Sequence, residues 1–194
     1  MGSDHLETRG AVLAGGRGSR LGGAKATAEL AGKPLIAYPL AALADAGLDP
    51  FVVAKPGVEM PALAAEVVLE SAEPRHPLAG IVAALRHAGR PVVVLGCDFP
   101  FVPPALLLYI AGALEPLVVP APGGDAQPLV ARWSPTLLPE LEASLAREEP
   151  LRRTVASLSP RLLDDAELTP FGDPARTFFN VNTPADLRAA ADLL

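Results

Sequence analysis

The sequence contains one cysteine, Cys97, in 194 residues. A single thiol excludes an internal disulfide and leaves no cluster of thiolates for a structural zinc site. A hydrophobic core must stabilise the fold instead, and a chain of this length can bury one. No histidine lies beside Cys97 in the sequence to activate it, so we expect a packed thiol at the end of a strand rather than a nucleophile. So few cysteines are typical of an intracellular protein.

Long apolar runs are also absent. The longest uncharged run, residues 99–114, is shorter than a membrane span and is interrupted by Pro100, Pro103 and Pro104. Residues 1–9 are polar and charged, without the apolar centre of a signal peptide. We therefore expect a soluble, cytoplasmic protein.

Positive charge is in the minority, because the formal net charge is −6 at pH 7. A chain of this charge has no general attraction for nucleic acid or for an anionic membrane, so neither is expected as a partner. If the protein binds a phosphate compound, it must do so through a local cluster of cations.

Amide side chains and lysines are scarce. Where a residue type has nearly disappeared, the remaining copies are candidates for specific roles. Asparagine occurs only at positions 180 and 182, glutamine only at 127, and lysine only at 25, 33 and 55, against thirteen arginines.

Strand-like and helix-like segments alternate along the chain. Residues 91–96 are the clearest expected strand, apolar on both faces as in the middle of a parallel sheet covered by helices. Residues 77–89 have proline at the front and glycine at the end, which predicts a helix. The length and the alternation predict a single domain, residues 1–194, folded as a three-layer α/β/α sandwich around a Rossmann-like, mostly parallel sheet. Further strands are expected at 51–54, 67–69, 117–120, 127–133 and 177–182, and further helices at 35–46, 105–114, 135–147, 151–158 and 185–194.

Three local features refine this outline. The turn signal Gly123-Gly124-Asp125 predicts a reversal that sets one antiparallel strand into the sheet. Pro39 must kink the helix expected at 35–46 or delay its start. Residues 161–171 look irregular, with room for one edge strand.

A glycine-rich loop follows the first apolar segment, residues 10–14, which is short enough for a buried strand or a helix fragment. Residues 15–25 hold five glycines, two arginines and one lysine. Glycines let backbone N–H groups approach an anion closely, while Arg17, Arg20 and Lys25 supply positive charge. We expect this loop to bind phosphate, since a purely structural turn would not need three cations.

Two common phosphate-binding motifs do not fit this loop. In the Rossmann fingerprint Gly-x-Gly-x-x-Gly the third glycine would come one position earlier than Gly22. The next strand also ends near Lys55, where an NAD enzyme would have an acid for the ribose. A Walker A loop needs Gly-Lys, but Ala24 separates Gly23 from Lys25. An NAD(P) oxidoreductase is therefore disfavoured.

Polar residues follow or occupy two other expected strands. Asp98 comes after the strand 91–96, and Asn180 and Asn182 lie in the strand 177–182. Ligands of open α/β sheets gather at the carboxyl ends of the strands, so these residues should converge with the glycine-rich loop. A single carboxylate beside substrate phosphates suits Mg²⁺, which makes Asp98 the candidate metal ligand; a turn or helix N-cap acid is the alternative role.

Five sequence blocks occur in a fixed order: Leu13-Ala-Gly-Gly-x-Gly-Ser-Arg20-Leu-Gly-Gly-x-Lys25, Pro77-Leu-Ala-Gly80, Cys97-Asp98-x-Pro100, Gln127-Pro-Leu129 and Phe179-Asn-Val-Asn-Thr-Pro-Ala-Asp-Leu187. Single blocks are shared with nucleotidyltransferases generally. The combination, which spans nearly the whole chain, resembles the molybdenum cofactor guanylyltransferase (MobA-type) family. The resemblance implies a nucleotide-diphospho-sugar transferase-like fold.

The resemblance also implies a nucleotide site. The backbone of Leu13, Ala14 and Gly15 would bind the guanine nucleotide, and Asp98 would contact it through Mg²⁺, the one implied cofactor. Glu70 is the nearest match to a nucleotide-contacting Asp of the family. The remaining implied positions are Gly16, Gly18, Arg20 and Lys25 around the phosphates, with Arg20, Lys25 and Asp98 as the catalytic residues.

For the second substrate, the resemblance implies that Gln127, Asn180 and Asn182 face a pterin, or that the asparagines support the metal. The implied reaction transfers GMP from GTP to the terminal phosphate of molybdopterin, with or without bound molybdenum, and releases pyrophosphate. Molybdoenzymes and other proteins of cofactor biosynthesis are the further partners that it implies.

Two departures from the family pattern leave open which nucleotide base the protein selects. His76 stands where the family usually has glycine before Pro-Leu-Ala-Gly, and Ala24 stands where an Asp often precedes the lysine. Gly15 resembles the guanylyl enzymes, whereas related cytidylyl enzymes tend to have Leu-Ala-Ala. The alternatives are a nucleotidyltransferase that uses CTP or another phosphate acceptor, and a GTP-binding escort without catalysis.

Overall fold

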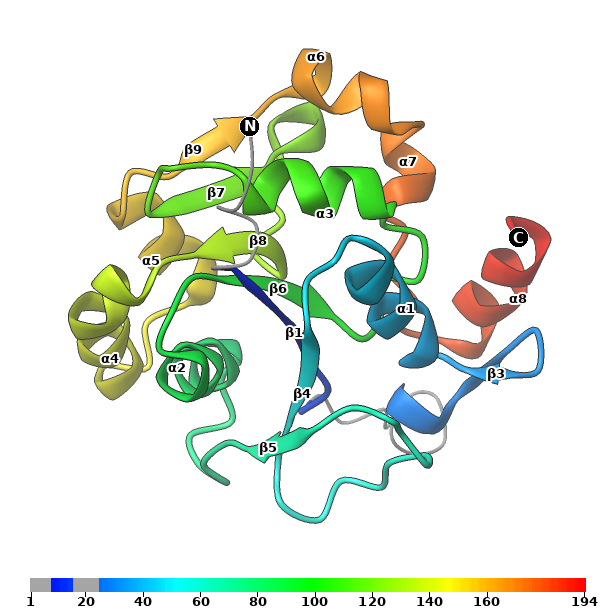
Figure 1. The fold of residues 1–194 in the computed structure, drawn as a ribbon, viewed down its shortest axis with the longest axis horizontal. Coiled ribbons are helices and arrows are strands. Elements are labelled where there is room, and N and C mark those ends of the chain that lie inside the picture. Colours follow the sequence, from blue (N-terminus) through cyan, green and yellow to red (C-terminus); the bar gives the residue numbers. More distant parts are fainter. Residues whose placement is uncertain (1–7, 16–24) are drawn as a thin grey trace.

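Seven strands form one sheet within residues 8–15 and 25–194, the parts of the chain that the computed structural model describes. Their order is β5-β4-β1-β6-β8-β7-β9 (Figure 1). β8 runs antiparallel to both of its neighbours, and the other pairs are parallel, which confirms the predicted architecture. The bounds are β1 Arg9–Leu13, β4 Pro50–Ala54, β5 Val67–Leu69, β6 Val92–Gly96, β7 Leu117–Pro120, β8 Val130–Trp133 and β9 Arg161–Leu163.

The order in which the chain adds strands to the sheet reverses beside β1. The chain adds β4 and then β5 on one side of β1 and later returns to the other side with β6, so that Ala11 faces Phe51 on one side and Val94 on the other. Such a switch point opens a crevice between the carboxyl ends of two neighbouring strands. The ends that meet here are Leu13 and Gly96, which places the crevice between Gly15 and Asp98.

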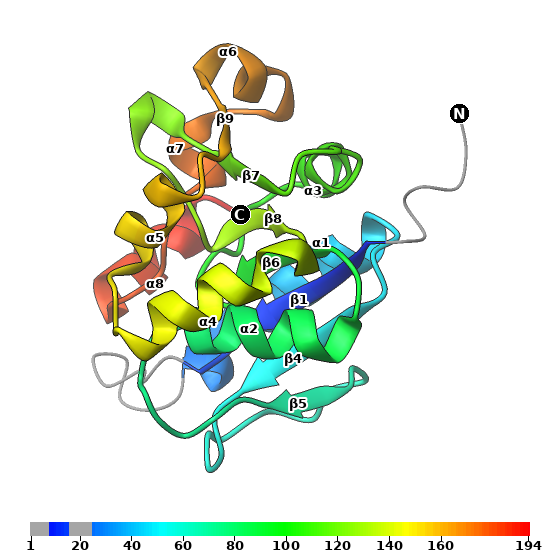
Figure 2. The same ribbon diagram turned by 90° about the vertical axis from the view of Figure 1, so that its left-hand side faces the viewer.

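Helices cover both faces of the sheet. α1 and α3 pack on one face and α2 and α4 on the other (Figures 1 and 2). Successive residues of a strand point to opposite faces, so in β1 Val12 joins the core beneath α1 and α3, while Ala11 joins the core beneath α2. The three predicted layers result, with one hydrophobic core on each face of the sheet. The bounds are α1 Ala37–Asp45, α2 Pro77–Ala88, α3 Pro104–Ala111 and α4 Leu138–Ala146.

The ends of these helices follow their sequence signals. α2 starts at Pro77 with His76 as its cap, where the imidazole Nδ1 accepts from the Leu78 backbone N–H at 3.2 Å. It ends at Gly89, whose φ of 61° lies in the left-handed region that glycine adopts without strain. In α1, Pro39 lies within the first turn, so it delays the start of the helix rather than kinking it.

Residues 177–182 do not form the predicted strand. A short helix, α7 (Pro174–Thr177), occupies the start of the segment, because Asp173 caps the Ala175 N–H at 3.0 Å and Pro174 stands at the first helical position. Residues 178–182 then run without regular structure to α8 (Pro184–Asp192). Of the residues that suggested a strand, Phe179 and Val181 pack instead in a third core, where Val181 is fully buried, and Phe178 packs against the core beneath α1 and α3.

The other elements need smaller corrections. β8 starts at Val130 instead of residue 127, since the Gln127 carbonyl accepts from the Val130 N–H in a turn. The edge strand expected in 161–171 is β9. In the described part of the chain, no helix is long and apolar enough to cross a membrane. The remaining bounds are η3 Lys25–Thr27, β2 Glu29–Leu30, β3 Lys33–Pro34, η4 Pro122–Gly124, η5 Pro135–Leu137, α5 Leu151–Ser157, α6 Asp165–Leu168 and η6 Thr169–Phe171.

Candidate active site

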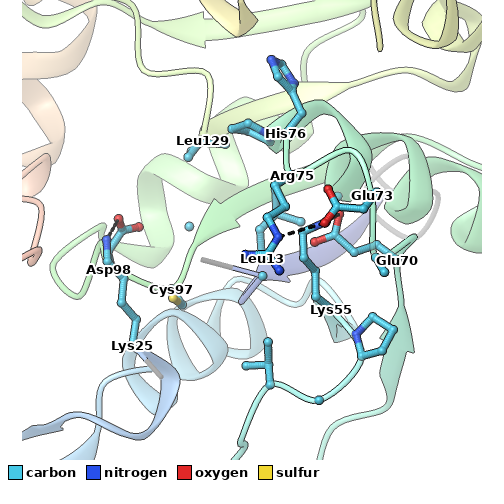
Figure 3. Close-up of a pocket in the computed structure, with 18 of the residues that line it drawn as sticks. Leu13, Lys25, Lys55, Glu70, Glu73, Arg75, His76, Cys97, Asp98 and Leu129 are labelled. Carbon is cyan, nitrogen blue, oxygen red and sulfur yellow. Dashed lines mark hydrogen bonds and ion pairs between the residues drawn. The ribbon is translucent and has the colours of Figure 1, made fainter. Parts of the chain in front are cut away.

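A cavity of about 750 Å³ opens at the carboxyl ends of β1 and β6, where the switch point predicts a ligand site. Its walls come from the ends of these two strands, the loop after β4 and the loop between β5 and α2. Its volume lies in the range of small-molecule and cofactor sites. Figure 3 shows two groups of charged side chains on its walls, with Lys25 and Asp98 on one side and Lys55 and Glu70 on the other.

Lys25 and Asp98 form a direct ion pair. The ammonium Nζ donates to Asp98 Oδ2 at 2.8 Å, and the two side chains are 14% and 13% exposed. A hydrogen bond between two charged groups that are largely shielded from water is stronger than one between neutral groups. Gly96 makes room for the carboxylate, because a Cβ there would lie 2.6 Å from Asp98 Oδ1. A cation and a carboxylate are therefore held together at one end of the cavity.

The two asparagines join this pair although they come from the far end of the chain. Lys25 Nζ donates to Asn182 Oδ1, and Asn182 Nδ2 donates to Asn180 Oδ1 at 2.7 Å. The Val181 N–H donates to the Asp98 carbonyl at 2.9 Å, which fixes the segment beside β6. Asp186, in the capping box of α8, accepts from the Asn182 N–H at 2.9 Å. The amide oxygen of Asn182 thus fixes the direction in which Lys25 points.

The donor atoms at this end suit Mg²⁺. In the described residues no three His, Cys, Asp or Glu side chains gather closely enough to hold a metal by themselves. Mg²⁺ commonly uses one or two protein carboxylates and completes its shell with water and substrate phosphates. Asp98 supplies one carboxylate beside the cavity, so it fits a metal that arrives with a nucleotide.

Lys55 and Glu70 form the second group. Lys55 Nζ lies 3.6 Å from Glu70 Oε2, an ion pair that is too long for a hydrogen bond. The Glu70 side chain is only 5% exposed, and its Oε2 has no hydrogen-bond partner among the described residues. Burial raises the pKa of Glu70, and the nearby Lys55 charge opposes that rise only in part. Within the described residues, one oxygen of this buried carboxylate therefore lacks the donors that normally satisfy such a group.

Gly15 lies against Glu70. A Cβ at position 15 would sit 2.2 Å from Glu70 Oε1, so only glycine allows the carboxylate to occupy this place. The two residues before it are tied into the sheet, because the Leu13 carbonyl accepts from Cys97 and the Ala14 N–H donates to Val53. Leu13 and Gly15 both line the cavity.

The other predicted site residues are placed as follows. Gln127 is not among the lining residues, and its side-chain amide donates to the Asp125 carbonyl at 3.1 Å. Cys97 is buried and, with Asp98 beside it, its pKa rises to about 12, which agrees with the expected packed thiol. Gly16, Gly18 and Arg20 lie outside the described residues.

Four charged lining residues had no assigned role in the sequence analysis: Lys55, Glu59, Glu73 and Arg75. Glu73 and Arg75 form an exposed ion pair at 3.1 Å on the loop before α2. His76, where the family usually has glycine, also lines the cavity while it caps α2. The scarcity of lysine was the one signal that could have pointed to Lys55.

Proteins of a known family are similar in sequence to almost the entire chain. The molybdenum cofactor guanylyltransferase of Rhizobium leguminosarum bv. trifolii is 36% identical over 197 aligned residues, which cover 95% of this chain and 91% of the relative. A probable molybdenum cofactor guanylyltransferase of Pelotomaculum thermopropionicum is 34% identical and covers 94% and 91%.

Solved structures agree with this match. A molybdopterin-guanine dinucleotide biosynthesis protein A from Archaeoglobus fulgidus superposes with a TM-score of 0.80 at 27% identity, over 95% of this chain and 97% of the other. A 2-C-methyl-D-erythritol 4-phosphate cytidylyltransferase from Thermus thermophilus shares the fold, with a TM-score of 0.69 at 24% identity over 96% and 98%. The profile of the MobA-like NTP transferase domain matches residues 10–162. The chain belongs to the MobA-like NTP transferase family.

Proposed function

We propose that this protein transfers GMP from GTP to the terminal phosphate of molybdopterin, with or without molybdenum, and releases pyrophosphate. The observation that carries the proposal is the Lys25–Asp98 ion pair, held by Asn182 beside a cavity at the switch point of the sheet. The guanylyltransferase names of relatives that match the full chain support the choice of substrates.

The reaction needs no protein nucleophile. The phosphate of molybdopterin is already ionised at neutral pH, so its oxygen can attack the α-phosphorus of GTP in line. A new P–O bond forms, the bond to the β-phosphate oxygen breaks, and pyrophosphate leaves. The buried thiol of Cys97 is unsuited to a covalent route, because only a thiolate is an effective nucleophile and its pKa is raised to about 12.

The chain's own contribution is therefore positioning and neutralisation of charge. Lys25 carries the positive charge that offsets the phosphates, and Asn182 orients it. Asp98 would hold Mg²⁺, which when bound supplies further positive charge at the phosphates. Arg20 is proposed as a second phosphate-binding cation from the first loop.

The remaining assignments complete the proposal. Residues 1–194 act as one nucleotidyltransferase domain in the cytoplasm. Asn180 and Gln127 bind the pterin, and molybdoenzymes or other cofactor-biosynthesis proteins receive the product. Use of CTP or of another phosphate acceptor is the second candidate function, which the fold shared with a cytidylyltransferase keeps open.

The test is pyrophosphate release from GTP in the presence of Mg²⁺ and molybdopterin. We expect release that requires both molybdopterin and the metal and that is much slower with CTP. Binding of GTP without release would contradict the enzyme assignment and indicate an escort protein. Faster release with CTP would contradict the assignment of the base but not the reaction type.

A further inference from the structure

The Lys55–Glu70 pair lies across the cavity from the Lys25–Asp98 pair that we assign to the phosphates (Figure 3). A nucleotide with its phosphates at Lys25 would direct another part of the molecule toward Lys55 and Glu70. The Glu70 carboxylate is buried, yet its Oε2 has no hydrogen-bond partner among the described residues. Buried carboxylates are rarely left without donors, and a ligand in the cavity can supply the donor that the described residues do not.

Lys55 is held in place by the loop that follows Glu70. Its Nζ donates to the Ser71 carbonyl at 2.9 Å and the Pro74 carbonyl at 3.4 Å, and it lies 3.6 Å from Glu70 Oε2. Its side chain is 14% exposed and lines the cavity. These contacts aim a fixed ammonium donor beside a fixed carboxylate acceptor. A ligand that matches this pair must carry an acceptor next to one or more donors.

The bases differ in this respect. Guanine has an acceptor, O6, next to the N1–H and N2–H₂ donors, whereas adenine and cytosine present an amino donor where guanine has its O6 acceptor. With adenine or cytosine, the amino group would face the Lys55 ammonium, so that two donors would meet. The ring nitrogen beside it, an acceptor, would face the Glu70 carboxylate, so that two acceptors would meet. Both contacts would leave buried charges unsatisfied, which costs more than a missing favourable contact.

We propose that Lys55 is a base-selecting residue, whose ammonium donates to O6 of guanine while the neighbouring Glu70 carboxylate accepts from N1–H and N2–H₂. This assignment rests on the proposed use of GTP and adds the residue that recognises its 6-oxo group. Gly15 is part of the same arrangement, since a side chain there would displace Glu70.

The experiment measures nucleotide binding by isothermal titration calorimetry on the full chain, without molybdopterin. GTP is compared with its 6-thio analogue, in which sulfur is a poor acceptor at position 6, and with ITP, which keeps O6 and N1–H but lacks the 2-amino group. The variants are Lys55→Met, which removes the donor, Lys55→Arg, which restores one, and Glu70→Gln, which removes the charge of the acceptor.

We expect the unmodified protein to bind GTP at least about tenfold more tightly than the 6-thio analogue, the effect of one hydrogen bond to a charged group. Lys55→Met should remove most of this preference, Lys55→Arg should restore part of it, and neither should change the preference for GTP over ITP. Glu70→Gln should reduce the preference over ITP and leave the preference over the 6-thio analogue in place.

Lys55→Met could also loosen the loop that it holds, but such an effect would weaken GTP and the 6-thio analogue by the same factor. Equal weakening would overturn the proposal and leave Lys55 with a structural role only, while the proposed function stands. If the unmodified protein bound no guanine nucleotide, both this proposal and the proposed function would fail. The two failures are therefore distinguishable.

Discussion

The cavity contains two lysine–carboxylate pairs that differ in how they are satisfied. Lys25 and Asp98 meet at 2.8 Å and are joined by Asn182, so both charges have hydrogen-bond partners within the protein. Lys55 and Glu70 stand 3.6 Å apart, and one oxygen of the more deeply buried carboxylate has no hydrogen-bond partner in the described part of the chain. Among the described residues, the first pair has all its hydrogen-bond partners without a ligand, whereas the second pair does not.

This difference assigns different tasks to the two ends. A pair that the protein already orients presents fixed charge to whatever enters, as a site for phosphate transfer requires. A buried carboxylate without donors discriminates between ligands, because only a ligand with donors in the right place removes the penalty. Changes at the first pair should therefore affect the rate, and changes at the second should affect the choice of base.

The largest effect is expected for Asp98→Asn. The amide keeps the shape of the side chain but loses the charge that pairs with Lys25 and that would hold Mg²⁺, so kcat should fall by about 10³-fold or more. Pyrophosphate release measures this effect, and thermal unfolding should show that the variant remains folded. Asp45→Asn, which changes an exposed acid at the end of α1, is the matched control and should leave kcat unchanged. Near-normal activity of Asp98→Asn would rule out its role at the phosphates.

Gly15→Ala should disrupt the Lys55–Glu70 pair and leave the Lys25–Asp98 pair unchanged. The new Cβ would lie 2.2 Å from Glu70 Oε1 and would push the carboxylate away, so GTP binding should weaken by about tenfold to a hundredfold. Titration with GTP and CTP measures the effect, and the preference for GTP over CTP should fall with it.

A second substitution can test whether this loss acts through Glu70. Glu70→Asp shortens the side chain by one methylene, so in the double variant it should recover part of the GTP affinity lost in Gly15→Ala. Strictly additive losses in the double variant would show that the two positions are not coupled.

Asn182→Ala should have a smaller effect on the first pair. Lys25 keeps Asp98 but loses the amide oxygen that orients it, so kcat should fall by about tenfold with little change in the KM for GTP. Steady-state kinetics at varied GTP separates these constants. An increase in KM alone would instead indicate that Asn182 binds substrate directly.

Glu70→Gln should stabilise the fold slightly at neutral pH. Burial raises the pKa of Glu70 in the folded protein, so its contribution to stability is full below the unfolded pKa and is lost as pH rises through the folded pKa. The glutamine mimics the neutral form at every pH and should raise the Tm by about 2–4 °C at pH 7.5. Thermal unfolding from pH 4 to 8 should show the gain shrinking toward acid pH, whereas a gain that grows toward acid pH would contradict the direction of the pKa shift.

Much of the fold could be predicted from local signals. The apolar strands β1 and β6, the proline and glycine at the ends of α2, and the turn before β8 each carry their structure in a few residues. The failure at 177–182 has a physical cause, since Asp173 and Pro174 start a helix there and the apolar residues that resembled a strand pack into two of the hydrophobic cores.

The site could be predicted only in part. Asp98 and Lys25 were expected to converge from the rule that strand ends meet, and the structure brings them together. The asparagines join them as expected, although the strand that was predicted to carry them does not form. The Lys55–Glu70 pair was not expected, because nothing in the sequence shows that the ends of two neighbouring strands aim these side chains at each other. Whether Gln127 binds the pterin stays a prediction.

A crystal structure of the protein with bound GTP tests the division of the cavity most directly. We predict that the guanine lies against Glu70 and Lys55 and that the α-phosphate lies beside Lys25 and Asp98. A nucleotide bound in the opposite direction, or a base that contacts neither Lys55 nor Glu70, would contradict the account.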